Sequence, residues 1–369
     1  MRKLLTELCH PKQWKTIASK DLLSQGYPVY GANGLIGYWR DYNHNSDVLT
    51  IGCRGTCGAL NIIGGKSYIN GNAMCLDELS HDIYIRYLYY YLRWYDLRKI
   101  ITGTTIPQIT IQGLQKVWVD YPSIKKQSEI VYVLDKVNLI IDYYQQQLQK
   151  LDDLVKARFV EMFGDPIHNE KGWMVSTLGE YMTLLTDFSA NGSYELLDSN
   201  VVMYDEPNYA IMVRTTDLEA GNLTNGVKYI DQSAYELLSK SKLYGGELIM
   251  NKIGSAGKIY MMPKIDRPAS LGRNAFMFRF DDRINMTYLY ALLSSDYGTK
   301  EIQQYVRGAV TKTITKESAR SIRIVVPPLE LQKQYAAFVQ QIDKSKFVVR
   351  QALDKAQLLF DSLMQQYFG

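Results

Sequence analysis

The chain has 369 residues, of which 46% are hydrophobic and 22% charged, which is the balance of a folded protein of two ordinary domains and excludes general disorder. Its apolar runs, such as Ile324-Val325-Val326, are far too short to cross a bilayer, and we expect no membrane span and no secretion signal. The net charge of +4 suits a polyanionic partner without requiring one, because many ordinary enzymes carry a similar charge.

Four cysteines, Cys9, Cys53, Cys57 and Cys75, are too few for a disulfide framework in a chain of this size, which favours a reduced, cytoplasmic setting. Cys53 and Cys57 are only a weak signal for a metal, because a zinc site needs four ligands and no second pair accompanies them. We therefore expect buried thiols, no metal and no cofactor.

In chain order, the sequence predicts four parts: a globular domain over 1–121, a long helix over 122–164, a second globular domain over 165–326 and a second long helix over 327–369. Pro122-Ser123 and Pro327-Pro328 are typical of a helix start. Gly164 and Gly369 supply the residue type that ends a helix in the left-handed conformation. The expected fold class is α+β, with a mixed sheet in each globular domain.

The second half of the chain repeats the first. A shift of 205 positions takes Gly103–Gly164 onto Gly308–Gly369 without a gap, and Gln127 then matches Gln332. Upstream the match is looser, with 55–58 resembling 254–257, 72–74 resembling 274–276 and 87–89 resembling 288–290. An internal repeat of this kind sets the architecture before any motif is considered. The chain is therefore predicted to contain two related globular domains, each followed by a related helix.

Each predicted helix carries apolar residues at alternating spacings of four and three, the pattern of a helix that packs lengthwise against another helix. In the second copy only Lys346 interrupts this seam. The obvious partner of each helix is the other copy. Two helices of about 40 residues would make a spacer of roughly 60 Å. If a pseudo-twofold axis relates the copies, the helices run antiparallel and form a coiled-coil-like spacer between the two domains.

Two similar but unequal readers on a rigid spacer suit two short DNA sequences at a fixed separation, because equivalent major-groove faces recur about every 34 Å. Residues 159–166 (FVEMFGDP), followed by Gly172-Trp173, resemble the junction between the first conserved helix and the second target-recognition domain of type I restriction-modification specificity subunits. Residues 327–332 (PPLELQ) resemble the entry to a conserved helix of that family. The resemblance covers essentially the whole chain, which departs from the pattern only by being short at its N-terminus, so we expect a trimmed first domain.

The resemblance implies a subunit that is not an enzyme. It implies that each recognition domain reads one half of an asymmetric bipartite site in double-stranded DNA. Two modification (methyltransferase) subunits would bind the helices and domain bases, restriction subunits would join the full complex, and adenine methylation and cleavage would occur on those partner chains. Ten apolar seam residues are the candidates for partner binding: Ile130, Leu134, Val137, Ile141, Leu148, Val339, Ile342, Val349, Leu353 and Phe360.

DNA contacts are expected in loops that combine glycine, which allows close backbone approach, with side chains that reach phosphates and base edges. Each candidate is equally consistent with an ordinary turn or strand-end residue, so the set carries more weight than any member. The candidates are Tyr30, Asn33, Arg54, Thr56, Thr104, Thr105, Gln108, Arg214, Thr215, Thr216, Lys252, Ser255, Lys258, Lys312 and Thr313.

Two other functions stay open. A methyltransferase or nuclease with an unrecognised site is one, although the chain has neither an Asp-Pro-Pro-aromatic strand end nor a glycine-rich cofactor loop, and Gly64-Gly65-Lys66-Ser67 lacks the first glycine of a phosphate-binding loop. A protein-interaction scaffold is the other. The scaffold predicts no salt-dependent binding to duplex DNA, which separates it from the specificity subunit.

Overall fold

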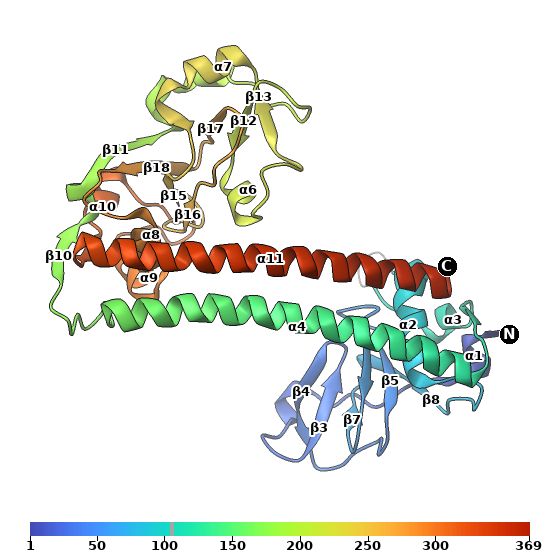
Figure 1. Cartoon of the computed structure of the whole chain (residues 1–369). Coiled ribbons are helices and arrows are strands. Elements are labelled where there is room, and N and C mark those ends of the chain that lie inside the picture. The colour runs from blue at the N-terminus through green and yellow to red at the C-terminus, as the bar shows by residue number, and fades with distance from the viewer. Residues whose placement is uncertain (104–106) are drawn as a thin grey trace. The chain divides into compact units, whose positions relative to one another are not determined.

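The structure is a computed structural model that describes residues 1–103 and 107–369. Its internal contacts divide the chain into two units: unit 1 contains Met1–Leu148 and Val348–Gly369, and unit 2 contains Gln149–Phe347. Two continuous helices, α4 (Ile124–Phe163) and α11 (Leu329–Phe368), each contribute residues to both units (Figure 1). Each unit combines these helical segments with β-sheets, which confirms the expected α+β class.

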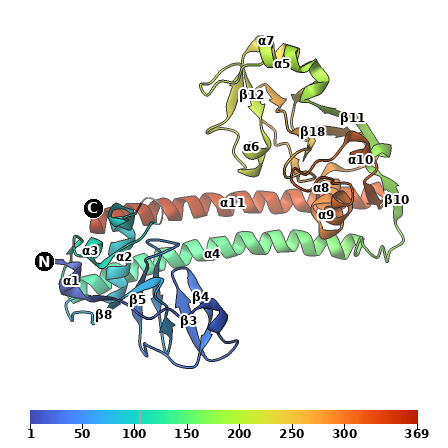
Figure 2. The same cartoon turned by 180° about the vertical axis from the view of Figure 1, so that it is seen from behind.

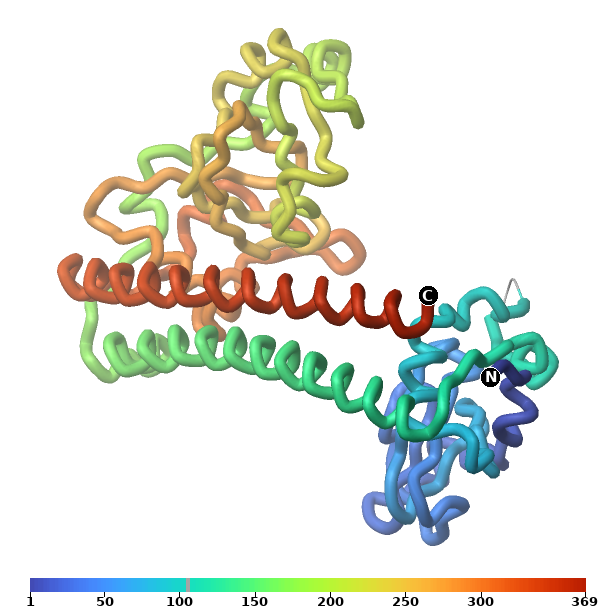
Figure 3. Tube along the Cα trace, turned by 45° about the vertical axis from the view of Figure 1, so that its right-hand side comes forward, coloured from blue at the N-terminus to red at the C-terminus, as the bar shows by residue number. Residues whose placement is uncertain are grey.

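Unit 1 contains one strand pair and two small sheets (Figure 2). Its strand pair is β1 (Arg2–Leu4) with β9 (Trp118–Asp120). The first sheet has the strand order β2 (His10–Gln13), β8 (Ala73–Asp77), β5 (Val48–Gly52), β6 (Leu60–Ile63). The second sheet has the strand order β4 (Gly34–Trp39), β3 (Tyr27–Gly31), β7 (Tyr68–Ile69). Its short helices are α1 (Leu5–Leu8), α2 (Ile85–Tyr95) and α3 (Ile111–Leu114), with 3-10 turns at Ser19–Asp21 and Leu97–Ile100. Both chain ends belong to this unit (Figure 3).

Unit 2 has a matching strand pair and two four-stranded sheets. The pair is β10 (Met174–Thr177) with β19 (Arg323–Val326). The first sheet has the strand order β11 (Met182–Asp187), β18 (Ala275–Phe280), β15 (Leu248–Asn251), β16 (Ile259–Met261). The second sheet has the strand order β13 (Lys228–Ile230), β12 (Ala210–Val213), β17 (Ala269–Leu271), β14 (Lys242–Leu243). Its helices are α5 (Tyr194–Asn200), α6 (Thr215–Glu219), α7 (Gln232–Leu237), α8 (Met286–Ser294), α9 (Asp296–Gln303) and α10 (Lys316–Arg320), with 3-10 turns at Leu178–Tyr181, Phe188–Asn191 and Ser239–Ser241.

The two long helices begin and end where the sequence predicts. α4 starts directly after Pro122-Ser123 and α11 directly after Pro327-Pro328. Gly164 follows α4 with φ of 76°, a left-handed conformation that glycine adopts without strain, and its N–H bonds to Val160 O at 2.8 Å. The division into 1–121, 122–164, 165–326 and 327–369 stays a prediction about the limits of the folded domains.

The apolar seam joins the two helices inside each unit. In unit 1, Ile130, Leu134 and Val137 of α4 share a buried cluster with Ala356 and Phe360 of α11. That cluster continues into α2, where the Tyr90 ring lies 6.1 Å from the Phe360 ring. The prediction that each helix packs on the other copy is confirmed at these positions.

In unit 2 the helices run antiparallel. The Phe159 ring lies 5.6 Å from the Tyr335 ring. Earlier along α4 and later along α11, Lys346 Nζ reaches Asp152 Oδ1 at 2.5 Å. Residue numbers therefore rise along one helix as they fall along the other. Lys346, the exception in the seam, is neutralised by a carboxylate of the opposite helix.

Two equivalent glutamines fasten the long helices to the globular parts. Gln127 and Gln332 are both fully buried. The Oε1 of Gln127 accepts a hydrogen bond from Tyr84 N, and that of Gln332 accepts one from Asn285 N, each at 2.8 Å. Their amides donate to the carbonyls of Pro122 and Pro327 respectively. This repetition explains why glutamine stands at both positions. Within the described residues, no helix is apolar over a stretch long enough to traverse a bilayer.

Candidate nucleic-acid interface

A tight hairpin turn is built twice, once in each unit. In unit 1, Gly52 N–H bonds to Ala59 O at 2.7 Å and Gly58 N–H to Gly52 O at 2.8 Å. In unit 2, Asn251 N–H bonds to Lys258 O at 2.9 Å and Gly257 N–H to Asn251 O at 2.8 Å. The turn requires glycine, because Gly55 and Gly254 have φ of 77° and 79°.

A second segment joins this turn in the same way in both units. Thr102 and Gln108 exchange backbone hydrogen bonds of 2.9 Å, and so do Arg307 and Thr313 at 2.8 and 2.9 Å. The next residue then bonds back toward the turn, from Ile109 N to Cys53 O and from Ile314 N to Lys252 O, each at 3.1 Å. We call the described parts of 52–59 and 102–110 loop cluster 1, and 251–258 and 307–315 loop cluster 2.

Loop cluster 1 contains three of the predicted DNA-contact residues. Arg54 and Thr56 are exposed on the turn, Gln108 is half-buried, and Arg54 and Gln108 form an isolated antiparallel bridge. The candidates Thr104 and Thr105 lie outside the described residues.

The turn between β3 and β4, which carries the candidate Asn33, lies against loop cluster 1. A Cβ added at Gly52 would come within 3.1 Å of Ala32 O and 2.3 Å of Thr56 O, so only glycine fits at this approach. Asn33 is exposed, whereas Tyr30 is half-buried at the end of β3. The structure thus brings the unit 1 candidates that it describes into one neighbourhood.

Loop cluster 2 places Ser255, Lys258 and Lys312 around a hollow of about 400 Å³. Gly254 N–H bonds to Lys312 O at 2.9 Å, which holds the two segments together. Ser255, Lys312 and Thr313 are exposed, while Lys258 is paired with Glu219 of α6. Donors and acceptors of this kind on a glycine turn are suited to phosphates and base edges.

Arg214, Thr215 and Thr216 lie at the start of α6, beside a second hollow of about 360 Å³ that Arg273 and Asn274 also line. The Arg214 guanidinium is committed to its own chain, since it donates to Asp217 Oδ1 at 2.6 Å and to Gly226 O at 2.9 Å. Of this group, Thr216 is exposed and the other two are half-buried.

Lys252 is neutralised in place. Asp187 Oδ2 accepts from Lys252 Nζ at 2.7 Å, and Asp187 Oδ1 accepts from Lys316 Nζ at 2.8 Å. Burial raises the pKa of Asp187, but the two ammonium groups outweigh that effect and hold its pKa below the ordinary carboxyl value. Both lysines are therefore held by the protein, and neither is a free phosphate ligand in this arrangement.

The equivalent position in unit 1 carries a neutral pair. Gln13 Nε2 donates to Cys53 Sγ at 2.9 Å, where unit 2 has Asp187 and Lys252. The two loop clusters thus share a backbone and differ in charge. Asp187, Lys316 and Glu219 are absent from the sequence predictions, because a lone carboxylate or lysine at a strand or helix end gives no signal without the tertiary contact.

Comparison with known proteins identifies the family. Residues 2–153 and 170–355 match the model of the type I restriction modification DNA specificity domain. The chain belongs to this family. Specificity subunits of type I systems are non-catalytic, which confirms the prediction that the chain is not an enzyme.

Curated relatives in the family match either most of the chain or a little over a third of it. The type I restriction enzyme MjaVIII specificity subunit of Methanocaldococcus jannaschii is 22% identical over 313 residues, which cover 81% of this chain and 73% of that protein. The EcoprrI specificity subunit of Escherichia coli is 26% identical over 145 residues, 38% of this chain and 36% of that protein.

Solved structures show the same fold. A type I restriction-modification S subunit from M. genitalium aligns over 100% of this chain and 96% of its own, with a TM-score of 0.61 and 16% identity. A chain from a type I R-M system solved for its complex assembly and conformational transition has a TM-score of 0.55 and 14% identity, over 100% and 97% of the two chains. The predicted architecture of the specificity subunits is confirmed at this level.

The ten seam residues predicted to bind partners of this specificity subunit are packed inside the chain. Ile130, Leu134, Val137, Ile141, Ile342 and Phe360 are buried, and Leu148, Val339, Val349 and Leu353 are half-buried. Seven of the ten belong to or pack against the buried apolar clusters of the two units, and direct contact of any of the ten with a partner stays a prediction. Other large apolar side chains of the same helices face solvent, including Leu139, Tyr143 and Leu358, which are 68%, 57% and 69% exposed.

Proposed function

We propose that this chain is the DNA-reading subunit of a type I restriction-modification complex and that its two loop clusters read the two halves of an asymmetric bipartite site in double-stranded DNA. The observation that carries the proposal is the repeated loop cluster, in which one backbone frame presents different side chains in each unit. Arg54 and Thr56 on one copy of the turn correspond to Ile253 and Ser255 on the other. Two loop clusters with the same backbone hydrogen bonds and different side chains are suited to two half-sites of different base sequence.

In this proposal, the domains over 1–121 and 165–326 are the target-recognition domains and the segments 122–164 and 327–369 are the conserved spacer helices. Two modification subunits dock on the spacer helices and restriction subunits complete the complex, which acts on DNA in the cytoplasm. Docking is supported by the exposed apolar residues on the helix faces away from the seam, since isolated apolar side chains are common on surfaces but several on one helix favour an interface.

We propose that the charged and the neutral side chains of the loop clusters make different kinds of contact with DNA. Exposed Arg54 and Lys312 hold phosphates or guanine edges, whereas Asn33, Thr56, Gln108, Ser255 and Thr313 supply the neutral donors and acceptors that select bases. Lys252, Lys258 and Arg214 bond to carboxylates of the protein and are proposed to shape the loops that carry the contacts. Adenine methylation and cleavage take place on the partner chains.

The experiment is to map methylated adenines in the genome of the native cell in four strains: with this chain, without it, and with a variant of each of the two loop clusters. Deletion should abolish a bipartite methylated motif. Ser255→Ala with Thr313→Ala should relax one half of the motif and leave the other half unchanged, and Thr56→Ala with Gln108→Ala should do the reverse. Each good base contact is worth about 1–3 kcal/mol of discrimination.

The proposal would be excluded if deletion left the methylome unchanged and the chain, expressed in the parent strain, captured no methyltransferase. Equal relaxation of both half-sites by both double variants would show that the loop clusters contribute to folding or to phosphate contact and not to base selection.

A further inference from the structure

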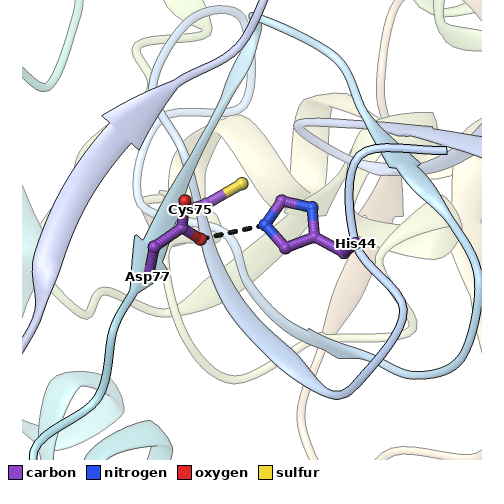
Figure 4. A group of neighbouring side chains, drawn as sticks. All are labelled: His44, Cys75 and Asp77. Carbon is purple, nitrogen blue, oxygen red and sulfur yellow. Dashed lines mark hydrogen bonds and ion pairs between the residues drawn. The ribbon is translucent and has the colours of Figure 1, made fainter.

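Unit 1 contains three potential metal ligands that the DNA-reading role leaves unused. His44 lies in the connection between β4 and β5, and Cys75 and Asp77 lie on β8. Their ligand atoms are within 4.8 Å of one another, and Figure 4 shows the three side chains as neighbours, with a His44 ring nitrogen facing the Asp77 carboxylate. Cys75 is fully buried and its two partners are half-buried.

The two ring nitrogens of His44 both face hydrogen-bond acceptors. Nδ1 lies 2.8 Å from Asn43 Oδ1, and Nε2 lies 2.9 Å from Asp77 Oδ1. The Asn43 amide has a fixed orientation, because its Nδ2 donates to Ile69 O at 3.0 Å and its Oδ1 accepts from Ile69 N at 2.8 Å. Nδ1 must therefore carry the ring proton, and the Nε2 lone pair of a neutral imidazole would point at a carboxylate.

A metal ion bound beside Nε2 and Asp77 would satisfy both of these acceptors. The position of Cys75 favours the metal. Cys75 and Asp77 are two residues apart on one strand, so their side chains point to the same face of the sheet. Cys75 thereby adds a third ligand atom to the group that His44 and Asp77 form.

We propose that His44 Nε2, Cys75 Sγ and an Asp77 carboxylate oxygen bind one zinc-type divalent cation, with water as the fourth ligand. Nitrogen, thiolate and carboxylate are the ligand types that Zn²⁺ takes in tetrahedral sites. The Asn43 carbonyl supplies the outer contact that metal-bound histidines make through their other ring nitrogen. The ion fastens the β4–β5 connection to β8 inside the first recognition domain, and its role is structural.

The site belongs to unit 1 alone among the two copies of this sheet. Strand pairing matches Met74 with Ile51 and Phe276 with Met250, so Cys75 and Asp77 correspond to Met277 and Arg279. Arg279 donates to Glu247 Oε1 at 3.1 Å and to Lys242 O at 2.8 Å. Unit 2 thus has an arginine where unit 1 has the Asp77 carboxylate, so these ligands are not repeated there. The sequence predicts no metal at Cys53 and Cys57, and in the structure these two thiols contact Gln13 and Pro107.

The test uses the full chain, stripped of metal with a chelator and titrated with Co²⁺, whose thiolate complexes show a charge-transfer absorption that other ligands do not give. We expect this absorption to saturate at one Co²⁺ per chain and Zn²⁺ to abolish it by displacement. Cys75→Ser should remove it, His44→Gln and Asp77→Asn should weaken it at least 10-fold in apparent affinity, and Asn43→Ala by about 10–100-fold. Cys57→Ser is the matched control and should leave it unchanged.

A second measurement covers the variants that fold poorly. The melting temperature of the wild-type chain should rise on adding Zn²⁺, whereas that of His44→Gln should not. Absence of the charge-transfer absorption in the folded wild-type chain, or its persistence in Cys75→Ser, would overturn the proposal and leave His44 and Asp77 as a hydrogen-bonded pair without a metal ion.

Discussion

The buried carboxylate of Asp187 provides the sharpest test of the account of loop cluster 2. Asp187→Asn keeps the shape of the side chain and removes the charge that both Lys252 and Lys316 contact. The Asp187 and Lys252 side chains are 8% and 14% exposed, so their pairing is largely shielded from water, whereas Lys316 is 40% exposed and can be solvated. Breaking a buried pair costs about 3–5 kcal/mol. Because the amide still accepts a hydrogen bond and water screens Lys316, we expect a loss of about 2–4 kcal/mol.

Hydrogen exchange read peptide by peptide is the suitable assay, because unfolding of a chain with two units need not follow a single transition. The loss should appear in β18 and β15 of unit 2 and not in β8 and β5 of unit 1. Asp266→Asn is the control, since Asp266 is exposed and changes the net charge equally. A loss below about 1 kcal/mol, or an equal loss in both units, would refute the argument from burial.

The same variant has a second expected effect, on DNA. Freeing one or two ammonium groups beside loop cluster 2 should make the affinity for non-specific duplex fall more steeply with salt, by about one to two units in the logarithmic slope. The control Asp266→Asn should leave the slope unchanged. A variant that is destabilised with no change in slope would show that the lysines lie away from the DNA.

Three further outcomes are expected. Gln332→Leu leaves two buried backbone groups without a hydrogen bond and should destabilise unit 2 by about 2–4 kcal/mol in urea unfolding. The control Gln340→Leu, on the exposed side of α11, should change the stability little. Equal effects of the two variants would contradict the argument from the buried hydrogen bonds. Lys346→Leu should cost no more than about 1 kcal/mol, since Asp152 is 49% exposed and stays solvated, and a loss above about 2 kcal/mol would show that the ion pair itself holds the helices together. The lowered pKa of Asp187 stabilises the fold at a pH above the ordinary carboxyl pKa of about 4, and this stabilisation is lost as the pH falls through the lower pKa of the folded state. Acid unfolding of the wild-type chain should therefore be steeper below about pH 4 than acid unfolding of Asp187→Asn. Parallel curves would exclude this contribution of Asp187.

The sequence by itself determined the repeat, the helices and the family. A repeat is visible because each copy must satisfy the same backbone groups, and Gln127 and Gln332 are buried for that reason in both units. The ends of α4 and α11 follow from proline and glycine, whose backbone restrictions act locally. The apolar seam is local as well, because a helix fixes which residues share a face.

Only the tertiary structure decided which candidates of the DNA set lie together and which are committed to the protein. Arg54 and Gln108 are far apart in the chain and form a bridge, while Lys252 is bound by Asp187, which lies 65 positions away. The same holds for His44 and Asp77, whose approach depends on how a connection folds onto a strand. Pairings of this kind depend on long-range packing, which carries no periodic signal in a single sequence, so charge and ligand chemistry at a site emerge only once the chain is folded.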